Sequence, residues 1–134
     1  MSQATIDRIG QGKYLSLTTF KRDGTGVPTP VWVAAEGDRL LVWTQADSGK
    51  AKRLRNSGHV LIAPCDSRGR LRGEQVPAAA QLLDQSGTAE VERAFLQKFG
   101  LTFRAFRILG KSRAKAGHVG VEIRLNGAAE NTRD

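Results

Sequence analysis

The sequence predicts one mainly β domain, an antiparallel barrel or sandwich with a few short helices beside it. Segments rich in β-branched and aromatic residues, or alternating between polar and apolar residues, recur along the chain. Tight turns join most of these segments, and the helical segments are few. This layout favours an antiparallel arrangement over a parallel doubly wound sheet. A length of 134 residues predicts a single domain covering 1–134.

The first part of the chain predicts a short helix followed by strands. Apolar residues at helical spacing predict the helix over residues 4–11. The pair Asp23-Gly24 is a common hairpin signal between the first two strands. Pro28 and Pro30 place part of the second strand at an edge or a bulge, because proline cannot donate to a ladder. The expected strands are 14–20, 27–35 and 39–44.

The second part predicts further strands and two helical regions. Asp47 or Ser48 can cap a helix over 50–56, with Ala51 and Leu54 facing the core. A mostly apolar strand over 59–65 is expected to be buried on both sides. The other expected segments are an extended stretch at 71–83, an amphipathic helix at 88–99, a second helical piece at 101–109, a strand at 118–125, and loose ends at 1–3 and 126–134.

The charge of the chain narrows the classes of partner. Lys and Arg number 21 against 13 Asp and Glu, a formal net charge of +8. Such an excess is typical of proteins that bind nucleic acid, an anionic membrane or a phosphorylated cofactor, although it also serves solubility. No helix-turn-helix, zinc spacing or RNA-binding motif is present, and no apolar run approaches the roughly 20 residues of a membrane span. One cysteine, Cys65, and no secretion signal predict a cytoplasmic protein.

A possible phosphate site follows the third strand. The strand ends near Thr44, a loop containing Gly49 follows, and a helix begins. The first turn of a helix carries unpaired N–H groups and a partial positive charge. Lys50 lies in that turn and Arg53 one turn later on the same side, while the hydroxyls of Thr44 and Ser48 are near in sequence. The segment is either a phosphate cradle or a solvated basic helix with an ordinary cap, and spacing alone leaves both open.

Several short motifs occur in a characteristic order over residues 10 to 125. They are Leu15-Ser16-Leu17-Thr18-Thr19-Phe20, Asp23-Gly24, Pro28-Thr29-Pro30-Val31-Trp32-Val33, Gly37-Asp38-Arg39-Leu40, Trp43-Thr44 and Ser48-Gly49-Lys50. In this order they resemble the pyridoxamine 5'-phosphate oxidase-like superfamily of FMN-binding split β-barrels. The match is closest to the branch that uses the deazaflavin coenzyme F420, the flavin/deazaflavin oxidoreductases of the B type.

The resemblance implies a fold, an assembly and an activity. It implies a homodimeric split β-barrel with the cofactor in the groove between two barrels. It implies an oxidoreductase that transfers a hydride between coenzyme F420 and a small conjugated organic substrate. The alternatives are an FMN-binding oxidoreductase of the same fold and a non-catalytic cofactor-binding or carrier protein.

The resemblance also implies site residues. The segment Thr29 to Trp32 would lie along the ring system, Trp43 and Thr44 near the ribityl chain and phosphate, and Lys50 on the phosphate. In flavin-binding relatives an arginine commonly opens the ring-facing strand, and Thr29 stands there in this chain, which favours the deazaflavin. Together with the residues of the possible phosphate cradle, the expected cofactor-binding residues are Thr29, Pro30, Val31, Trp32, Trp43, Thr44, Ser48, Gly49, Lys50 and Arg53. The acidic oligoglutamyl tail of F420 would give a use to Lys52, Arg55, Arg68 and Arg70.

Other chemically interesting residues have simpler interpretations. No general acid stands out, and Tyr14, the only tyrosine, is interpreted as a packing residue. His59 and His118 are isolated, so no metal site is expected. Cys65 is expected to be a small core residue. The four phenylalanines near the end of the chain are expected to make core or dimer contacts: Phe95, Phe99, Phe103 and Phe106. Residues 111–115 are expected to form a basic loop.

Overall fold

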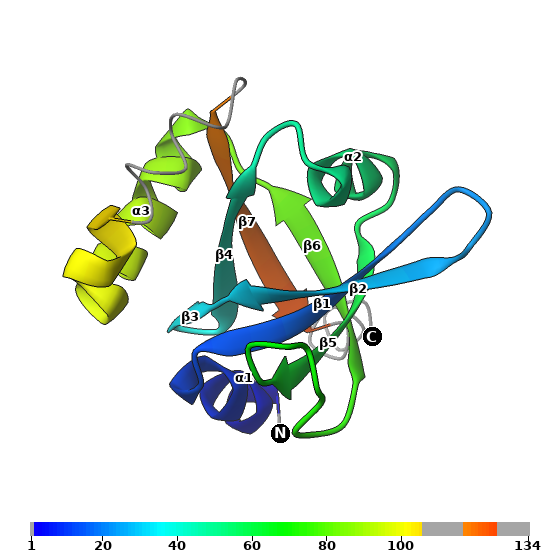
Figure 1. Ribbon diagram of the computed structural model, residues 1–134, viewed down its shortest axis with the longest axis horizontal. Coiled ribbons are helices and arrows are strands. Elements are labelled where there is room, and N and C mark those ends of the chain that lie inside the picture. Colours follow the sequence, from blue (N-terminus) through cyan, green and yellow to red (C-terminus); the bar gives the residue numbers. More distant parts are fainter. Residues whose placement is uncertain (1, 106–116, 126–134) are drawn as a thin grey trace, which may run out of the picture.

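The structure is a computed structural model that describes residues 2–105 and 117–125. Seven antiparallel strands form one curled sheet, with helices at its ends and on one face (Figure 1). Residues 101–105 are also helical. The elements are α1 (Ser2–Gln11), β1 (Tyr14–Phe20), β2 (Gly26–Trp32), β3 (Ala34–Glu36), β4 (Arg39–Gln45), α2 (Gly49–Asn56), β5 (His59–Cys65), β6 (Val76–Leu82), α3 (Gln85–Phe99) and β7 (His118–Leu125).

The two edges of the sheet are consecutive in the chain. The strand order is β2-β1-β5-β6-β7-β4-β3. β2 pairs with β1 up to the pair Trp32–Tyr14, and β3 pairs with β4 from Ala34 onward. Val33 stands between them, and its N–H donates to the carbonyl of Lys13. One strand bent at Val33 therefore joins the two edges and curls the sheet into a half-barrel.

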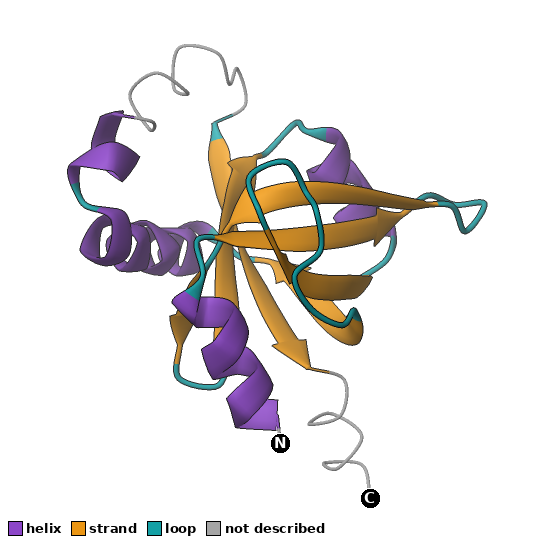
Figure 2. Ribbon diagram, turned by 60° about the horizontal axis from the view of Figure 1, so that its bottom comes forward, coloured by secondary structure: helices purple, strands orange, loops and turns teal. Residues whose placement is uncertain are grey.

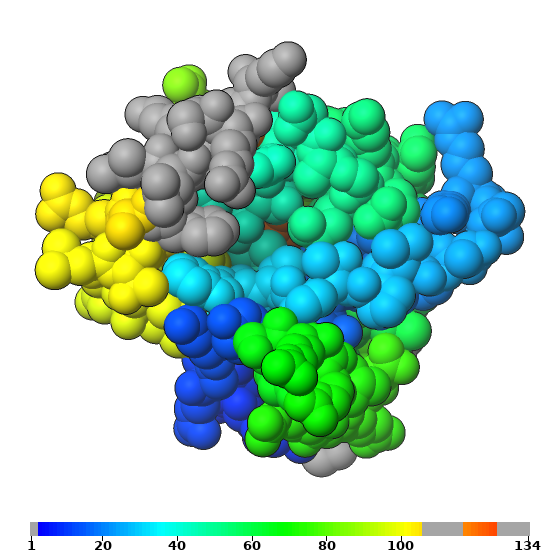
Figure 3. Space-filling view, viewed as in Figure 1, coloured from blue at the N-terminus to red at the C-terminus, as the bar shows by residue number. Residues whose placement is uncertain are grey.

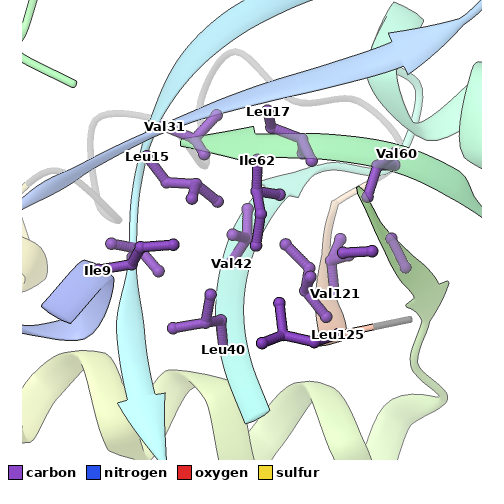
Figure 4. Close-up of a cluster of buried hydrophobic side chains, with 14 of the residues drawn as sticks. Ile9, Leu15, Leu17, Val31, Leu40, Val42, Val60, Ile62, Val121 and Leu125 are labelled. Carbon is purple, nitrogen blue, oxygen red and sulfur yellow. The ribbon is translucent and has the colours of Figure 1, made fainter. Parts of the chain in front are cut away.

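The interior of the half-barrel is filled with aliphatic side chains. Figure 4 shows Leu15 and Leu17 from β1, Val31 from β2, and Leu40 and Val42 from β4 converging on one another. Leu15 and Leu17, like Leu40 and Val42, are two positions apart and so point to the same face, because successive side chains of a strand point to opposite faces of the sheet. Burying each such side chain is worth roughly 1.5–3 kcal/mol, so this cluster is the main stabilising core.

The helices close the ends of the half-barrel and cover part of its outer face. α1 inserts Ile6 and Ile9 into the same core, and α2 contributes Leu54. α3 packs on the outer face of the sheet, where it forms a second cluster with side chains of β3 and β4 (Figures 1 and 2). That cluster consists of Ala34, Leu41, Val91, Phe95 and Phe103, with Trp32, Trp43, Leu83, Ala94, Leu96 and Phe99 at its margin.

The structure confirms most expected elements and changes several of them. The helix expected over 4–11 begins at Ser2, so Ser2 and Gln3, which were expected to be loose, are helical. The strands at 14–20, 59–65 and 118–125 have the expected bounds, and the proline-containing strand lies at an edge. The strand expected at 27–35 is interrupted at Val33, where the chain changes partner. The helix expected from 88 begins at Gln85, because the Asp84 carboxylate caps it by accepting from the Gly87 N–H. The strand expected to be buried on both sides has an exposed His59.

Parts of the expectation fall outside the described residues. These are the second helical piece beyond 105, the basic loop at 111–115 and the tail at 126–134. In the part of the chain that the structure describes, no helix combines the length and apolar character needed to cross a membrane.

Candidate functional site

A cavity of about 430 Å³ opens where β2 and β4 diverge. β4 continues past its pairing with β3 and passes the end of β2. Figure 3 shows this face hollowed between the cyan residues of β2 and the teal segment that leads into α2. The lining residues are Tyr14, Pro30, Val31, Trp32, Trp43, Thr44, Gln45, Ser48, Lys50, Phe95, Phe103 and His118. This volume is within the ~300–1,000 Å³ range of small-molecule sites.

One end of the cavity is polar and sits at the start of α2. Ser48 is the N-cap of the helix, and its Oγ accepts from the Ala51 N–H at 3.2 Å. Thr44 Oγ1 lies 3.4 Å from Ser48 Oγ, which joins the end of β4 to the cap. The expectation that Asp47 or Ser48 caps this helix therefore resolves to Ser48.

Lys50 brings a positive charge to the polar end. Its side chain is partly buried, and this burial, followed by the charge of Arg53, lowers its pKa from the usual value of a lysine. A desolvated ammonium is unfavourable in isolation and gains from an anionic partner. Since the described residues that line the cavity include no Asp or Glu, the balance of their charge favours an anion.

Arg53 lies near Lys50, as helical spacing suggests, and it also contacts β1. Its Nε donates to Thr19 Oγ1 at 2.6 Å, which ties α2 to β1. Its guanidinium also lies over Gly49, where an added Cβ would come within 2.9 Å of Nη1. Arg53 is not among the residues that line the cavity, and a side chain at position 49 would require the Arg53 guanidinium to shift.

The other end of the cavity is aromatic. The His118 imidazole stacks on the Trp43 indole, with ring centroids 5.2 Å apart and an interplanar angle of 18°. Phe103 meets Trp43 edge-on at 5.5 Å, and Phe95 meets Phe103 at 5.3 Å. These contacts fix the orientation of the wall. Trp43 Nε1 is buried and has no hydrogen-bond partner within the described residues, so this wall holds an unused donor.

The structure gathers most of the sequence-predicted site residues around one cavity. Seven of the ten line it: Pro30, Val31, Trp32, Trp43, Thr44, Ser48 and Lys50. Thr29, Gly49 and Arg53 do not. Thr29 pairs with Leu17 at a position directed to the barrel side of the sheet. Their individual roles toward a cofactor stay predictions.

Five lining residues were not predicted as site residues. They are Tyr14, Gln45, Phe95, Phe103 and His118. His118 reaches the cavity because β7 pairs with β4, which puts it opposite Gln45. A sequence signal existed, since the alternating strand that begins at His118 needed a partner, but no local pattern identifies β4 as that partner.

The remaining candidates lie elsewhere. His59 stacks on Phe20 at 5.3 Å, away from the cavity lining, and no group of three or more His, Cys, Asp or Glu suited to a metal ion occurs within residues 2–105 and 117–125. Cys65 is buried, as expected, and burial followed by the Asp66 charge raises its pKa. Of the residues assigned to an acidic tail, Arg70 pairs with Asp66 and Arg55 donates to the Ala46 carbonyl.

Comparison with known proteins shows the fold. No protein-family model matches the sequence, and no curated protein matches it. A conserved hypothetical protein of Mycobacterium tuberculosis has a similar structure, with a TM-score of 0.66 and 23% identity over 93% of this chain and 81% of the other. A Listeria innocua protein, provisionally named a pyridoxamine 5'-phosphate oxidase, matches with a TM-score of 0.61 and 16% identity over 92% and 89% of the two chains.

A third similar structure is an FAD-binding protein of Mesorhizobium loti. It matches with a TM-score of 0.62 and 15% identity over 93% of this chain and 88% of the other. Identities this low show a shared fold and leave function to the site. The chain thus shares the split-barrel fold of pyridoxamine 5'-phosphate oxidase-like proteins, which confirms that part of the resemblance.

Proposed function

We propose that the chain is an oxidoreductase that holds a phosphorylated flavin-type cofactor in the cavity between β2 and β4. One observation carries the proposal: a single cavity joins an anion-favouring end at Lys50 and Ser48 to an aromatic end at Trp43 and His118. Phosphorylated ring cofactors have these two parts, an anionic group and a planar apolar system. The similar fold of the FAD-binding Mesorhizobium loti protein supports the same class of ligand.

The polar end would bind the phosphate. Lys50 would form a charge-assisted hydrogen bond to a phosphate oxygen, of the kind worth about 1.5–3 kcal/mol. The hydroxyl of Thr44, close to the cap, would add a donor. Ser48 already holds the start of α2 by its cap, so it would fix the direction from which Lys50 enters the cavity.

The aromatic end would orient the ring system. Trp32 and Pro30 form the β2 side of the cavity, and the stacked pair Trp43 and His118 the opposite side. When bound, a flavin-type cofactor supplies the hydride chemistry, and these residues position it and exclude water.

Coenzyme F420 is the first candidate and FMN the second. Thr29 occupies the place where flavin-binding relatives commonly carry an arginine, and the net charge of +8 suits the acidic tail of F420. The proposed substrate is a small conjugated organic molecule. The proposed assembly is a homodimer in which a second barrel closes the open side of the cavity.

Cofactor titration tests the proposal. We expect saturable binding of F420 or FMN to the purified protein, with a dissociation constant below the high micromolar range. Lys50→Ala should weaken binding about 10- to 100-fold, from the loss of the charged hydrogen bond. In the FMN titration Lys52→Ala is the matched control, because FMN lacks the acidic tail for which Lys52 is a candidate, and Lys52 lies on the same helix, carries the same charge and is exposed outside the cavity lining.

The outcomes separate the alternatives. No saturable binding of either cofactor, or equal loss in the two lysine variants, would contradict the proposed site. Binding without hydride transfer to any of a panel of conjugated carbonyl and quinone acceptors would favour the carrier alternative. A yellow protein carrying flavin after purification would favour FMN over F420.

A further inference from the structure

Lys98, near the end of α3, donates to three backbone carbonyls at once. Its Nζ lies 2.8 Å from the oxygen of Gly10, 2.6 Å from that of Gly12 and 2.7 Å from that of Val33. An ammonium carries three N–H donors, so each donor has an acceptor. These charge-assisted bonds join α3 to the end of α1 and to the bend between β2 and β3.

Two of these carbonyls lie where the regular backbone pattern changes. α1 ends at Gln11, and the last carbonyls of a helix have no intrahelical N–H partner. Gly10 is within that last turn. Val33 stands where the strand leaves β1 and has not yet joined β4. A side-chain donor at this corner therefore serves groups that the secondary structure leaves open.

The same corner borders the aromatic end of the cavity. Trp32, which lines the cavity, immediately precedes Val33. Phe99, next to Lys98, packs against Trp32 with ring centroids 4.8 Å apart and an interplanar angle of 34°. Phe95, which precedes Lys98 by less than one turn of α3, also lines the cavity. A single side chain thus links the α3 wall to the β2 wall.

We propose that Lys98 is a positioning residue that sets the separation of Trp32 and α3, and so the width of the aromatic end of the cavity. Lys98 is not among the cavity-lining residues and acts through Trp32 and Phe95. What fills the cavity rests on the proposed function, while the link between the two walls does not. Partial burial lowers the pKa of Lys98, although the residue as a whole remains exposed.

The test replaces Lys98 by methionine, which keeps an unbranched side chain and removes all three donors. Lys13→Met is the matched control. It also removes an ammonium from an aromatic ring, since Lys13 Nζ lies 4.8 Å from the centroid of Trp32 and Lys98 Nζ lies 5.2 Å from that of Phe99, but the three carbonyl bonds are made by Lys98. Both variants lose one positive charge and one ammonium–ring contact, so a difference between them reports on the three carbonyl bonds.

Two readouts are measured below the melting temperature. The first is the indole N–H cross-peak of Trp32 in ligand-free protein, assigned with Trp32→Phe, together with hydrogen exchange of the amides around Val33 and Phe95. The second is the dissociation constant of FMN and of F420. We expect Lys98→Met to shift the Trp32 signal, accelerate exchange at both walls and weaken cofactor binding at least fivefold. Lys13→Met should change each of these three readouts by a much smaller amount.

Lys98→Gln provides a graded variant, because its amide keeps two N–H donors on a shorter side chain. Its Trp32 signal, amide exchange rates and cofactor affinity should lie between those of the wild type and of Lys98→Met. It takes the place of Lys98→Met if that variant does not fold. A Lys98 variant that melts earlier but keeps the wild-type Trp32 signal and cofactor affinity would overturn the proposal. If the wild-type protein binds neither cofactor, the proposed function fails, and the Trp32 signal and exchange rates still decide the role of Lys98.

Discussion

The imidazole of His118 lies flat against the indole of Trp43, and the two rings come from strands paired across 75 residues of sequence. The backbone around them is held at both ends. The Gly117 carbonyl accepts from the Ala46 N–H at 2.9 Å, and the Gly120 N–H donates to Thr88 Oγ1 at 3.0 Å. The stacked pair is therefore a fixed wall of the cavity.

The first prediction concerns this wall. His118→Ala should weaken binding of a ring cofactor, because aromatic pairs add about 0.5–1.5 kcal/mol beyond area burial. His118→Phe should restore most of the affinity, since it returns a planar ring. Fluorescence titration of FMN or F420 measures both variants. Equal weakening by alanine and phenylalanine would mean that the imidazole nitrogens, and not the stacked ring, matter for binding.

The second prediction separates helix stability from ligand binding. Ser48→Ala and Asp84→Ala each remove an N-cap acceptor, from α2 and α3 respectively. Each should lower the free energy of unfolding by about 0.5–2 kcal/mol, measured by urea denaturation. Only Ser48→Ala should also weaken cofactor binding, because Ser48 lines the cavity and Asp84 does not. Comparable binding loss in both variants would assign the effect to general destabilisation.

The third prediction is a pH dependence of anion binding. Burial and the neighbouring Arg53 lower the pKa of Lys50, so the free protein loses this charge at a lower pH than an ordinary lysine, whose pKa is about 10.4. Affinity for FMN, whose phosphate stays dianionic above about pH 7, should therefore fall as pH rises from about 7 to 10. In Lys50→Arg the fall should be absent, because guanidinium stays charged. A pH-independent wild-type affinity would contradict the role of Lys50.

The fourth prediction concerns acid stability. Glu122 on β7 accepts from Arg39 Nη1 at 2.7 Å and from Arg124 Nε at 3.1 Å. Burial raises its pKa, but these two hydrogen bonds and charges outweigh burial, and the net pKa is lowered. A lowered folded-state pKa gives stability that is present above the unfolded-state value of about 4.3 and is lost as pH falls through the folded-state value.

Glu122→Gln should therefore flatten the decline of unfolding free energy below about pH 4.3, while lowering stability at neutral pH. Urea denaturation at a series of pH values measures this slope. Exposed Glu74 provides the control substitution Glu74→Gln, which should leave the slope near that of wild type. An unchanged slope in Glu122→Gln would show that the ion pairs with Arg39 and Arg124 contribute nothing measurable, as for many surface pairs.

Local patterns in the sequence identified most of the strands and the polar half of the site. Ser48 and Lys50 are neighbours in the chain, so a strand followed by a capped helix was enough to associate them. Helical spacing also placed Arg53 near Lys50, but its hydrogen bond to Thr19 on β1 depends on packing between distant elements, which no local pattern shows. The aromatic half depends on pairing between distant strands and on the packing of α3, and no local pattern carries that information.

Because of the bend at Val33, a ligand that binds between β2 and β4 should raise the stability of the folded chain. Among the described residues, β2 and β4 share no ladder, and the bend joins β2 to β3, the strand that pairs with β4. A molecule bound between them would add contacts that the empty barrel lacks, so the free energy of unfolding should rise by RT ln(1 + [L]/Kd) as the site fills. Melting temperature can therefore rank candidate cofactors and substrates for this chain before any reaction is known.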